Sequence, residues 1–337
     1  MLRIRPIQSN DLDDLHKMAI TSGVGVTSLP KNKDYLETKI NESLRAFDPK
    51  VSKPGAESYL FVLEDLDKKK VIGISGIIAK VGGFEPYYTY KIEEKHYEDK
   101  ELSVSNDMEM LCLETNHSGP TEICSLFLLP DYRKHGHGRL LSLHRFLFIK
   151  EFSSRFEQEI ISEMRGVSAE DGKSPFWESV GRHFFKTDYN QADLLSGLGN
   201  KAFIKNLMPR HPIYIELLPQ DVQKVIGKVH DKTKPALKLL EGEGFVYQQE
   251  VDIFDAGPTV AVKLEEIRTV KEAKQGKVVK IEPSLSGDTL LVSNTELDFR
   301  ACLGVVQNTK DGFVISEEVA GALDIAIGDD ICSVSLR

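Results

Sequence analysis

Residues 122–149, EICSLFLLPDYRKHGHGRLLSLHRFLFI, decide the fold of this chain. Residues 123–128 form a short apolar run that predicts a buried strand, and the Pro130-Asp131 pair ends it. Farther on, large side chains recur at the spacing of one face of an amphipathic helix: Leu140, Leu141, His144 and Phe148. A glycine-containing turn therefore joins a buried strand to a helix.

The turn itself, Arg133-Lys134-His135-Gly136-His137-Gly138, predicts an anion-binding loop. Glycine lets a phosphate approach the backbone, and the first N–H groups of a helix have no partner within that helix. The helix dipole adds positive potential at the same place. The pattern Arg-x-x-Gly-x-Gly differs from the glycine motifs of dinucleotide and nucleoside triphosphate sites. It resembles the pyrophosphate loop of the GNAT superfamily, the acyl-CoA-dependent N-acyltransferases; the alternative is an ordinary strand-to-helix connection.

A second stretch resembles the helix and strand that flank the CoA chain in the same superfamily. It is ALKLLEGEGF at residues 236–245, which matches the pattern Ala-x-x-Leu-Tyr-x-x-x-Gly-Phe except at one position. Leu240 stands where the superfamily often has a tyrosine that protonates the departing CoA thiolate. A different acid is therefore needed, and His230 lies close upstream.

His230 follows a segment that predicts a helix. Pro219 suits a first helical turn, and residues 222–229 carry an apolar face. His230 would then lie at or just beyond the helix C-terminus, where the negative end of the dipole raises the pKa of a histidine toward or above neutrality. A proton donor needs such a pKa. The alternative is an exposed histidine that only stabilises its helix.

The composition indicates a globular chain of two units that folds without disulfides. It has 337 residues, a net charge of −9 and four cysteines in no metal-binding spacing. The acidic balance and the dispersed Lys and Arg residues argue against a nucleic-acid or membrane surface. No two histidines have ligand spacing with a third partner, so we predict no metal. Reduced thiols and the lack of an apolar leader predict a cytoplasmic protein.

Periodicity along the chain predicts an α+β fold. The order before the central strand is strand, helix, helix, strand, strand, followed by residues 81–107, which are polar and rich in tyrosine and predict a solvated flap. We predict a GNAT-like domain with a mixed, largely antiparallel sheet over residues 1–265. Residues 166–230 would form a second lobe, either a large insertion or a partial duplication. Residues 266–337, with short strands and Gly/Asp/Asn turns, predict a small β-barrel-like domain.

Beyond the superfamily, the chain closely resembles the bacterial arginine N-succinyltransferases. The stretches that carry the resemblance are CSLFL at 124–128, the turn at 133–138, EMRG at 163–166, SPFW at 174–177, KAFI at 201–204, LMPRHPIY at 207–214, VIGKVH at 225–230 and DIFDAGPT at 252–259. The resemblance implies transfer of succinyl from succinyl-CoA, a cosubstrate and not a permanently bound cofactor, to the α-amine of L-arginine. It also implies that His230 is the proton donor and that Leu126 contacts succinyl-CoA.

The resemblance and the loop together define the predicted site. The CoA-binding residues predicted in the loop are Arg133, Lys134, Gly136 and Gly138. A backbone N–H near Leu126 is the predicted oxyanion donor. Arg165 and Asp255 are candidates for binding the succinyl carboxylate and the guanidinium, but a structural ion pair explains either equally well.

Two other functions stay open at this point. One is acyl transfer to ornithine or another amine, and the other is a non-catalytic CoA-binding subunit. An intact His230 argues against the second. The chain is expected to form a homo-oligomer or to pair with a related subunit.

Overall fold

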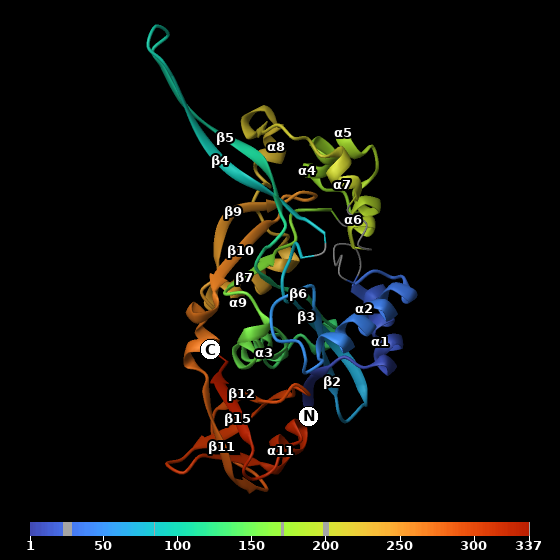
Figure 1. Cartoon of the computed structure of the whole chain (residues 1–337), viewed down its shortest axis with the longest axis vertical. Helices are drawn as coiled ribbons and strands as arrows, with labels where there is room; N and C mark the ends of the chain where they lie inside the picture. The colour runs from blue at the N-terminus through green and yellow to red at the C-terminus, as the bar shows by residue number, and fades with distance from the viewer. Residues whose placement is uncertain (23–28, 84, 170–171, 198–201, 337) are drawn as a thin grey trace.

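The larger part of the molecule is one mixed sheet with helices on both faces (Figure 1). The computed structural model describes residues 1–22, 29–83, 85–169, 172–197 and 202–336. The sheet has the order β1-β2-β3-β6-β7-β10-β9-β4-β5-β8, and only the β6–β7 pair is parallel. Its strands are β1 (Leu2–Pro6), β2 (Ser58–Asp65), β3 (Lys70–Ile78), β4 (Tyr87–Asp99), β5 (Val104–Asn116), β6 (Thr121–Leu128), β7 (Glu159–Glu163), β8 (Ile213–Tyr214), β9 (Val246–Asp252) and β10 (Pro258–Lys263). The predicted α+β, GNAT-like sheet is confirmed.

The last part of the chain forms a closed five-stranded barrel, which confirms the predicted β-barrel-like unit. Its elements are β11 (Lys274–Glu282), β12 (Thr289–Asn294), β13 (Ala301–Asn308), β14 (Phe313–Ser316), α11 (Glu317–Leu323) and β15 (Asp330–Ser335). The order is β12-β15-β11-β14-β13, and β13 pairs back to β12. β13 also pairs with β1 through Ile4 and Ala301, so the barrel continues the main sheet. The boundary at residues 265/266 stays a prediction.

Helices α1 (Leu12–Ser22) and α2 (Lys33–Ala46) cover one face of the sheet beside β2 and β3. The side chain of Asn32 begins α2 by accepting a hydrogen bond from the Tyr35 N–H at 2.9 Å. Leu36 and Ile40, four residues apart, are buried against the sheet. The predicted strand, helix, helix, strand, strand order is therefore confirmed.

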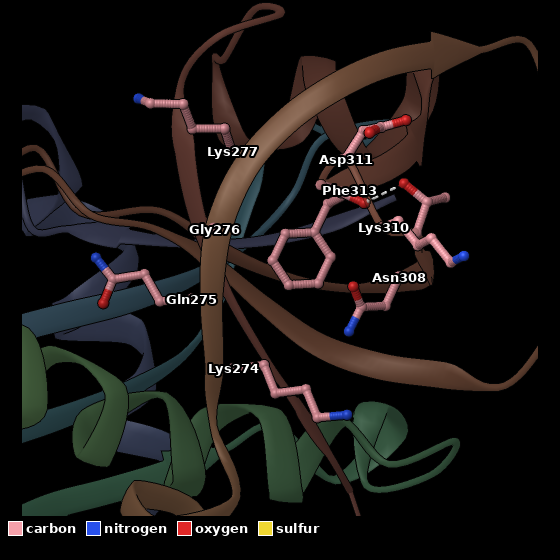
Figure 2. A pocket seen from close by; sticks show the side chains of 10 residues that line it. Lys274, Gln275, Gly276, Lys277, Asn308, Lys310, Asp311 and Phe313 are labelled. Atoms are coloured by element: carbon pink, nitrogen blue, oxygen red, sulfur yellow. Dashed lines mark hydrogen bonds between the residues drawn. The ribbon is translucent and has the colours of Figure 1, made fainter.

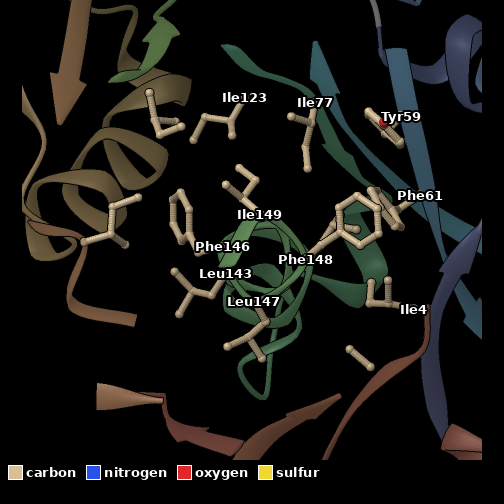
Figure 3. Packing of buried hydrophobic residues seen from close by; sticks show 14 of the residues in the cluster. Ile4, Tyr59, Phe61, Ile77, Ile123, Leu143, Phe146, Leu147, Phe148 and Ile149 are labelled. Atoms are coloured by element: carbon tan, nitrogen blue, oxygen red, sulfur yellow. The ribbon is translucent and has the colours of Figure 1, made fainter. Parts of the chain in front are cut away.

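Helix α3 (His137–Glu151) is buried on all sides. The helix itself was predicted correctly, but the prediction that one of its faces is exposed to solvent is wrong. Every residue from 140 to 149 is buried. The helix packs on β3 and β6 on one side and on the barrel strands β12 and β13 on the other. In Figure 3, Ile149 points toward Ile123 of the sheet, whereas Leu147 points the opposite way, toward the barrel. The barrel covers the face of α3 that would otherwise meet water.

β4 and β5 form a long hairpin arm that projects from the body of the molecule (Figure 1). The predicted solvated flap at residues 81–107 is thus wrong for its first half, because Tyr87, Tyr88 and Tyr90 are buried. They are buried because β9 and the neighbouring helices cover the base of the arm, where Tyr90 pairs with Val251. Only the outer part of the arm is exposed.

Described residues between 166 and 230 form a lobe of short helices beside the base of the arm (Figure 1). Its elements are α4 (Pro175–Ser179), α5 (Gly181–Phe185), α6 (Tyr189–Gly197), α7 (Ala202–Leu207), β8 and α8 (Gln220–Gln223), and α9 (Lys234–Gly242) follows. Trp177 is fully buried at the centre of the lobe and stacks on Phe185 with ring centroids 5.3 Å apart. Over the described ranges, no helix is long and apolar enough to cross a membrane.

Candidate active site

The parallel strands β6 and β7 pair only at their first residues and then separate. Their last pair is Glu122 with Ile161, whereas β6 stays paired with β3 as far as Leu128. Ser162 Oγ still reaches the Ile123 carbonyl at 3.2 Å. Beyond this contact no strand pairing joins β6 to β7 in the described chain. The separated edge of β6 therefore leaves backbone groups available to a ligand.

The backbone of β6 is irregular immediately before Leu126. Ser125 has a φ of 55°, and the register between β6 and β3 shifts at the same place. On the α3 side, the buried guanidinium of Arg145 donates to the Cys124 carbonyl at 3.2 Å. Burial lowers the pKa of Arg145 to about 10, so this group stays cationic at neutral pH. The bulge redirects the half-buried Leu126, as bulges near active sites commonly do.

The segment predicted to be an anion-binding loop follows β6 directly and ends at the N-terminus of α3. Gly136 is the N-cap of α3 and has a φ of 80°, a conformation that residues with a Cβ rarely adopt. Arg133 Nε donates to the Leu128 carbonyl at 2.9 Å, and the guanidinium lies 5.7 Å from the Phe127 ring centroid. The Arg133 and Lys134 side chains are both exposed. The loop thus combines two cationic side chains with the N-terminus of a fifteen-residue helix.

Gly138, in the first turn of α3, has no structural reason to be glycine. A Cβ added at this position would meet nothing within 4 Å, and the residue lies inside the helix. Glycine costs about 1 kcal/mol relative to alanine at such a position. The open space beside Gly138 is compatible with the predicted role of this glycine in CoA binding, which stays a prediction.

Tyr132, which sequence reasoning missed, holds the loop against the turn between β2 and β3. Its hydroxyl donates to Asp65 Oδ2 at 3.0 Å and accepts from Lys68 Nζ at 2.8 Å. Its carbonyl contacts His137 Nδ1 at 3.1 Å. No local pattern could have found this role, because both hydroxyl partners come from a distant hairpin.

His230 lies at the carboxyl end of β7, on the other side of the separation from Leu126. Its N–H donates to the carbonyl of Arg165, two residues beyond β7, at 2.9 Å. Val229 forms an isolated bridge with Gly166, and both Leu126 and Val229 pack against one core cluster. Because β6 and β7 are parallel, their carboxyl ends share an edge of the sheet. The fold therefore brings His230, Leu126 and the loop to one edge.

The predicted helix before His230 is much shorter than expected. Helix α8 ends at Gln223 because the chain turns at Gly227, which has a φ of 68° and donates its N–H to the Ala256 carbonyl at 2.9 Å. His230 is instead the N-cap of the 3-10 helix Asp231–Thr233. It therefore lies at the start of a helix and not at the end of one.

The electrostatic setting of His230 is also the reverse of the predicted one. Burial, followed by the Arg165 and Lys232 cations, lowers the pKa of His230, so the prediction of a raised pKa is wrong. Nδ1 accepts a hydrogen bond from the Lys232 N–H at 3.1 Å. The neutral ring therefore carries its proton on Nε2.

Asp255 and Arg165, the two candidates for substrate binding, make structural contacts. The buried carboxylate of Asp255 accepts from the Gly166 and Gly257 N–H groups, each at 2.8 Å. These hydrogen bonds tie the end of β7 to the β9–β10 turn. Because both carboxylate oxygens already accept from the backbone, Asp255 is unsuited to bind a guanidinium. Arg165 Nη2 donates to Ser168 Oγ at 2.7 Å, beside His230.

A broad groove on the barrel contains none of the predicted site residues (Figure 2). Its volume is about 580 Å³, and β11 and the β13–β14 turn line it. Figure 2 shows Lys274, Lys277 and Lys310 pointing in different directions, away from any common centre. We therefore place the candidate site at the separation of β6 and β7.

An α+β fold in which two parallel strands separate beside an Arg-x-x-Gly-x-Gly loop defines a GNAT-type, acyl-CoA-dependent acyltransferase. The family model described as "Arginine N-succinyltransferase beta subunit" matches residues 2–269, and the model of its C-terminal domain matches residues 274–335. The chain belongs to the arginine N-succinyltransferase family and is an acyltransferase that uses an acyl-CoA as cosubstrate.

Individual relatives match along the whole chain. Proteins named arginine N-succinyltransferase from Yersinia enterocolitica and Escherichia coli are 42% and 40% identical, covering 100% of this chain and 98% of each relative. The solved structure of the arginine/ornithine succinyltransferase subunit AI from Pseudomonas aeruginosa has a TM-score of 0.91 and 34% identity. It covers 100% of this chain and 99% of its own.

Proposed function

We propose that this protein transfers the succinyl group of succinyl-CoA to the α-amine of L-arginine and releases N2-succinyl-L-arginine and CoA. The observation that carries the proposal is the convergence of the anion loop, the separated edge of β6 and His230 on one edge of the sheet. The names of full-length relatives support the choice of succinyl-CoA and arginine.

The loop binds the CoA pyrophosphate through the first N–H groups of α3 and the side chains of Arg133 and Lys134. The pantetheine arm enters between β6 and β7 and pairs with the free edge of β6. This places the thioester carbonyl beside Leu126, whose backbone region supplies the oxyanion donor. Such a donor contributes about 3 kcal/mol to transition-state stabilisation.

The neutral α-amine attacks the thioester carbonyl, and a tetrahedral intermediate carries the new C–N bond. His230, neutral at rest, takes up on Nδ1 the proton that the nitrogen loses, and Nδ1 gives up its hydrogen bond from the Lys232 N–H. The imidazolium then delivers a proton to the sulfur as the C–S bond breaks. The lowered pKa of His230 suits this step. An imidazolium with a pKa below about 6.5 gives its proton readily to a thiolate whose thiol has a pKa of about 8.5.

The test is release of free CoA thiol from succinyl-CoA with and without L-arginine. We expect arginine-dependent release by the wild type and a loss of about 100-fold or more in kcat for His230→Ala, with succinyl-CoA binding kept. His211→Ala, which removes an exposed histidine of the same lobe, is the matched control and should be fully active.

Each outcome of that experiment separates the proposals. Equal activity of wild type and His230→Ala would keep the enzyme and reject His230 as the proton carrier. Faster release with L-ornithine than with L-arginine would assign a different acceptor. No release by either protein, with CoA still bound, would favour the non-catalytic subunit.

We also propose a cytoplasmic homo-oligomer in which the outer arm contacts a second copy of the chain. Four free cysteines support the location. A two-stranded ribbon is only marginally stable alone, and the arm exposes Leu102 and Val104 near its tip, by 76% and 48%. Sedimentation of the purified protein as a monomer would contradict the assembly.

A further inference from the structure

Three polar side chains lie within the buried part of α3: Ser142, His144 and Arg145. The helix is otherwise apolar over residues 140–149, where it packs between the main sheet and the barrel. A buried polar group costs free energy unless it has a hydrogen-bond partner. The partners that His144 and Arg145 find in the sheet lie at the irregular part of β6.

The β3–β6 pair has a bulge in which two residues of β6, the second of them Leu126, stand opposite Ser75 of β3. On the β3 side, His144 Nε2 lies 2.8 Å from Ser75 Oγ. On the β6 side, Arg145 Nη1 donates at 3.2 Å to the carbonyl directly before the bulge. Two adjacent residues of α3 therefore hold the bulge from both strands.

All three nitrogens of the Arg145 guanidinium donate hydrogen bonds. Nε donates to the Ser142 carbonyl and Nη2 to Ser142 Oγ, each at 3.0 Å, and Nη1 donates to the Cys124 carbonyl. Because the guanidinium is planar, the three contacts fix both its position and its orientation. The Cys124 carbonyl is therefore held in one direction at the start of the bulge.

The charge of Arg145 has no counter-ion in the described part of the chain. Its three partners are uncharged, and no described carboxylate forms an ion pair with it. Burial of such a cation is unfavourable. Arg155 is also buried, but it donates to the carbonyls of Ala46 and Asp48 at the C-terminus of α2, the negative end of the helix dipole. A structural role accounts for Arg155 and leaves the charge of Arg145 uncompensated.

The missing negative charge would arise near Leu126, where the thioester carbonyl is proposed to bind. Leu126 is two residues beyond Cys124, and a strand advances about 3.3 Å per residue, so the oxyanion would form within about 7 Å of the Cys124 peptide group. A fixed cation at this range in a water-excluded interior favours the oxyanion without having to reorganise during the reaction.

We propose that Arg145 is a positioning residue for the oxyanion donor of acyl transfer. Its guanidinium fixes the bulge through the Cys124 carbonyl, and its charge is compensated when the oxyanion forms. The contact between His144 and Ser75 braces the opposite strand. The inference deepens the proposed function and rests on it.

The test uses Arg145→Met, which keeps an apolar stem and removes the charge, and Arg145→Lys, which keeps the charge. We expect Arg145→Met to lower kcat about 100-fold and to leave KM for L-arginine and Kd for succinyl-CoA within about threefold. Arg145→Lys should recover about tenfold of that loss. Arg155→Met is the matched control, because it also removes a buried arginine. It should lower the melting temperature and leave kcat within about threefold.

Infrared difference spectroscopy separates this role from a structural one. The probe is succinyl-CoA labelled with carbon-13 at its thioester carbonyl. When it binds to the wild type, its C=O stretch should move to lower wavenumber than in water, because an oxyanion donor polarises the bond. Arg145→Met should lose most of this shift, whereas Arg155→Met should retain it.

A wild-type kcat in Arg145→Met, or a wild-type carbonyl shift in that variant, would overturn the inference. If Arg145→Met failed to fold, the same comparison would be made with Arg145→Gln, which is neutral but can still donate to the Cys124 carbonyl. Absence of arginine-dependent CoA release by the wild type would reject the proposed function. The carbonyl shift needs no acceptor and would then decide the inference alone: loss of the shift without the Arg145 charge supports it, and an equal or absent shift in both proteins overturns it.

Discussion

His230, the proposed proton carrier, lies in an environment that keeps its ring neutral at rest. Burial is the largest cause that lowers its pKa, and the Arg165 and Lys232 cations add to the effect. The ring therefore becomes imidazolium only as the pH falls through a value below about 6.5. An imidazolium cannot accept the proton of the attacking amine, so activity should be lost as the pH falls through this pKa and not as it rises.

The pH profile of kcat/KM for arginine tests whether activity is lost as the pH falls through the pKa of His230. Protonation of the substrate amine alone should lower the value by about tenfold per pH unit, and the fall should steepen to about 100-fold per unit below the pKa of His230. In His230→Gln the steeper limb should disappear. Loss of wild-type activity as the pH rises above 7 would show instead that the imidazolium is the form required at the start.

The role of His230 stays a prediction, whereas the prediction of its environment was wrong. The VIGKVH stretch and the missing tyrosine at Leu240 pointed to His230 from sequence alone. Its pKa depends on Arg165, which is distant in sequence and reaches His230 only through the end of β7. Gly227 was a visible signal that the preceding helix would break, since glycine near a helix end commonly takes a left-handed conformation.

The α3 N-terminus gives the element-scale prediction. Gly138→Ala should raise the free energy of unfolding by up to about 1 kcal/mol, because alanine favours the helix and its Cβ meets open space. The same Cβ would enter the space of the pyrophosphate, so KM for succinyl-CoA should rise about tenfold. Chemical unfolding and initial rates measure the two effects.

Gly321→Ala is the matched control for Gly138→Ala. Gly321 lies in α11 of the barrel, and an added Cβ there also meets nothing within 4 Å. It should stabilise the protein by a similar amount and leave KM unchanged. If Gly138→Ala also left KM unchanged, the loop would be an ordinary strand-to-helix connection.

Elements with local signals were predictable, and those defined by distant partners were not. The β6 strand, the loop and the N-terminal helices follow from periodicity and glycine placement. The burial of α3 depends on the barrel, and the burial of Tyr90 depends on β9. The polar composition around Tyr90 therefore predicted exposure to solvent for residues that the tertiary fold buries.

At the scale of the whole molecule, the barrel and the main sheet form one structure. β1 pairs with β13, and α3 lies between the two parts (Figure 1, Figure 3). The two parts are linked by α10 (Arg268–Glu272). Lys150 of α3 fixes this link, because its Nζ donates to the carbonyls of Val270 and Ala273 at 3.0 and 2.9 Å. We therefore expect unfolding in a single cooperative transition.

Glu243 is the polar centre of this link and gives the last prediction. Its buried carboxylate accepts from Arg268 Nη2 at 2.6 Å and from the Thr269 N–H at 2.7 Å, while Arg268 Nη1 reaches the Ser335 carbonyl of β15 at 3.1 Å. Glu243→Gln leaves the Arg268 cation without its buried counter-ion, so the free energy of unfolding should fall by about 3 kcal/mol. Glu272→Gln removes the exposed partner of the same arginine and should cost less than about 1 kcal/mol. Urea unfolding followed by circular dichroism measures both. Two separate transitions in the wild type would show that the barrel unfolds independently and that the link does not couple the two parts.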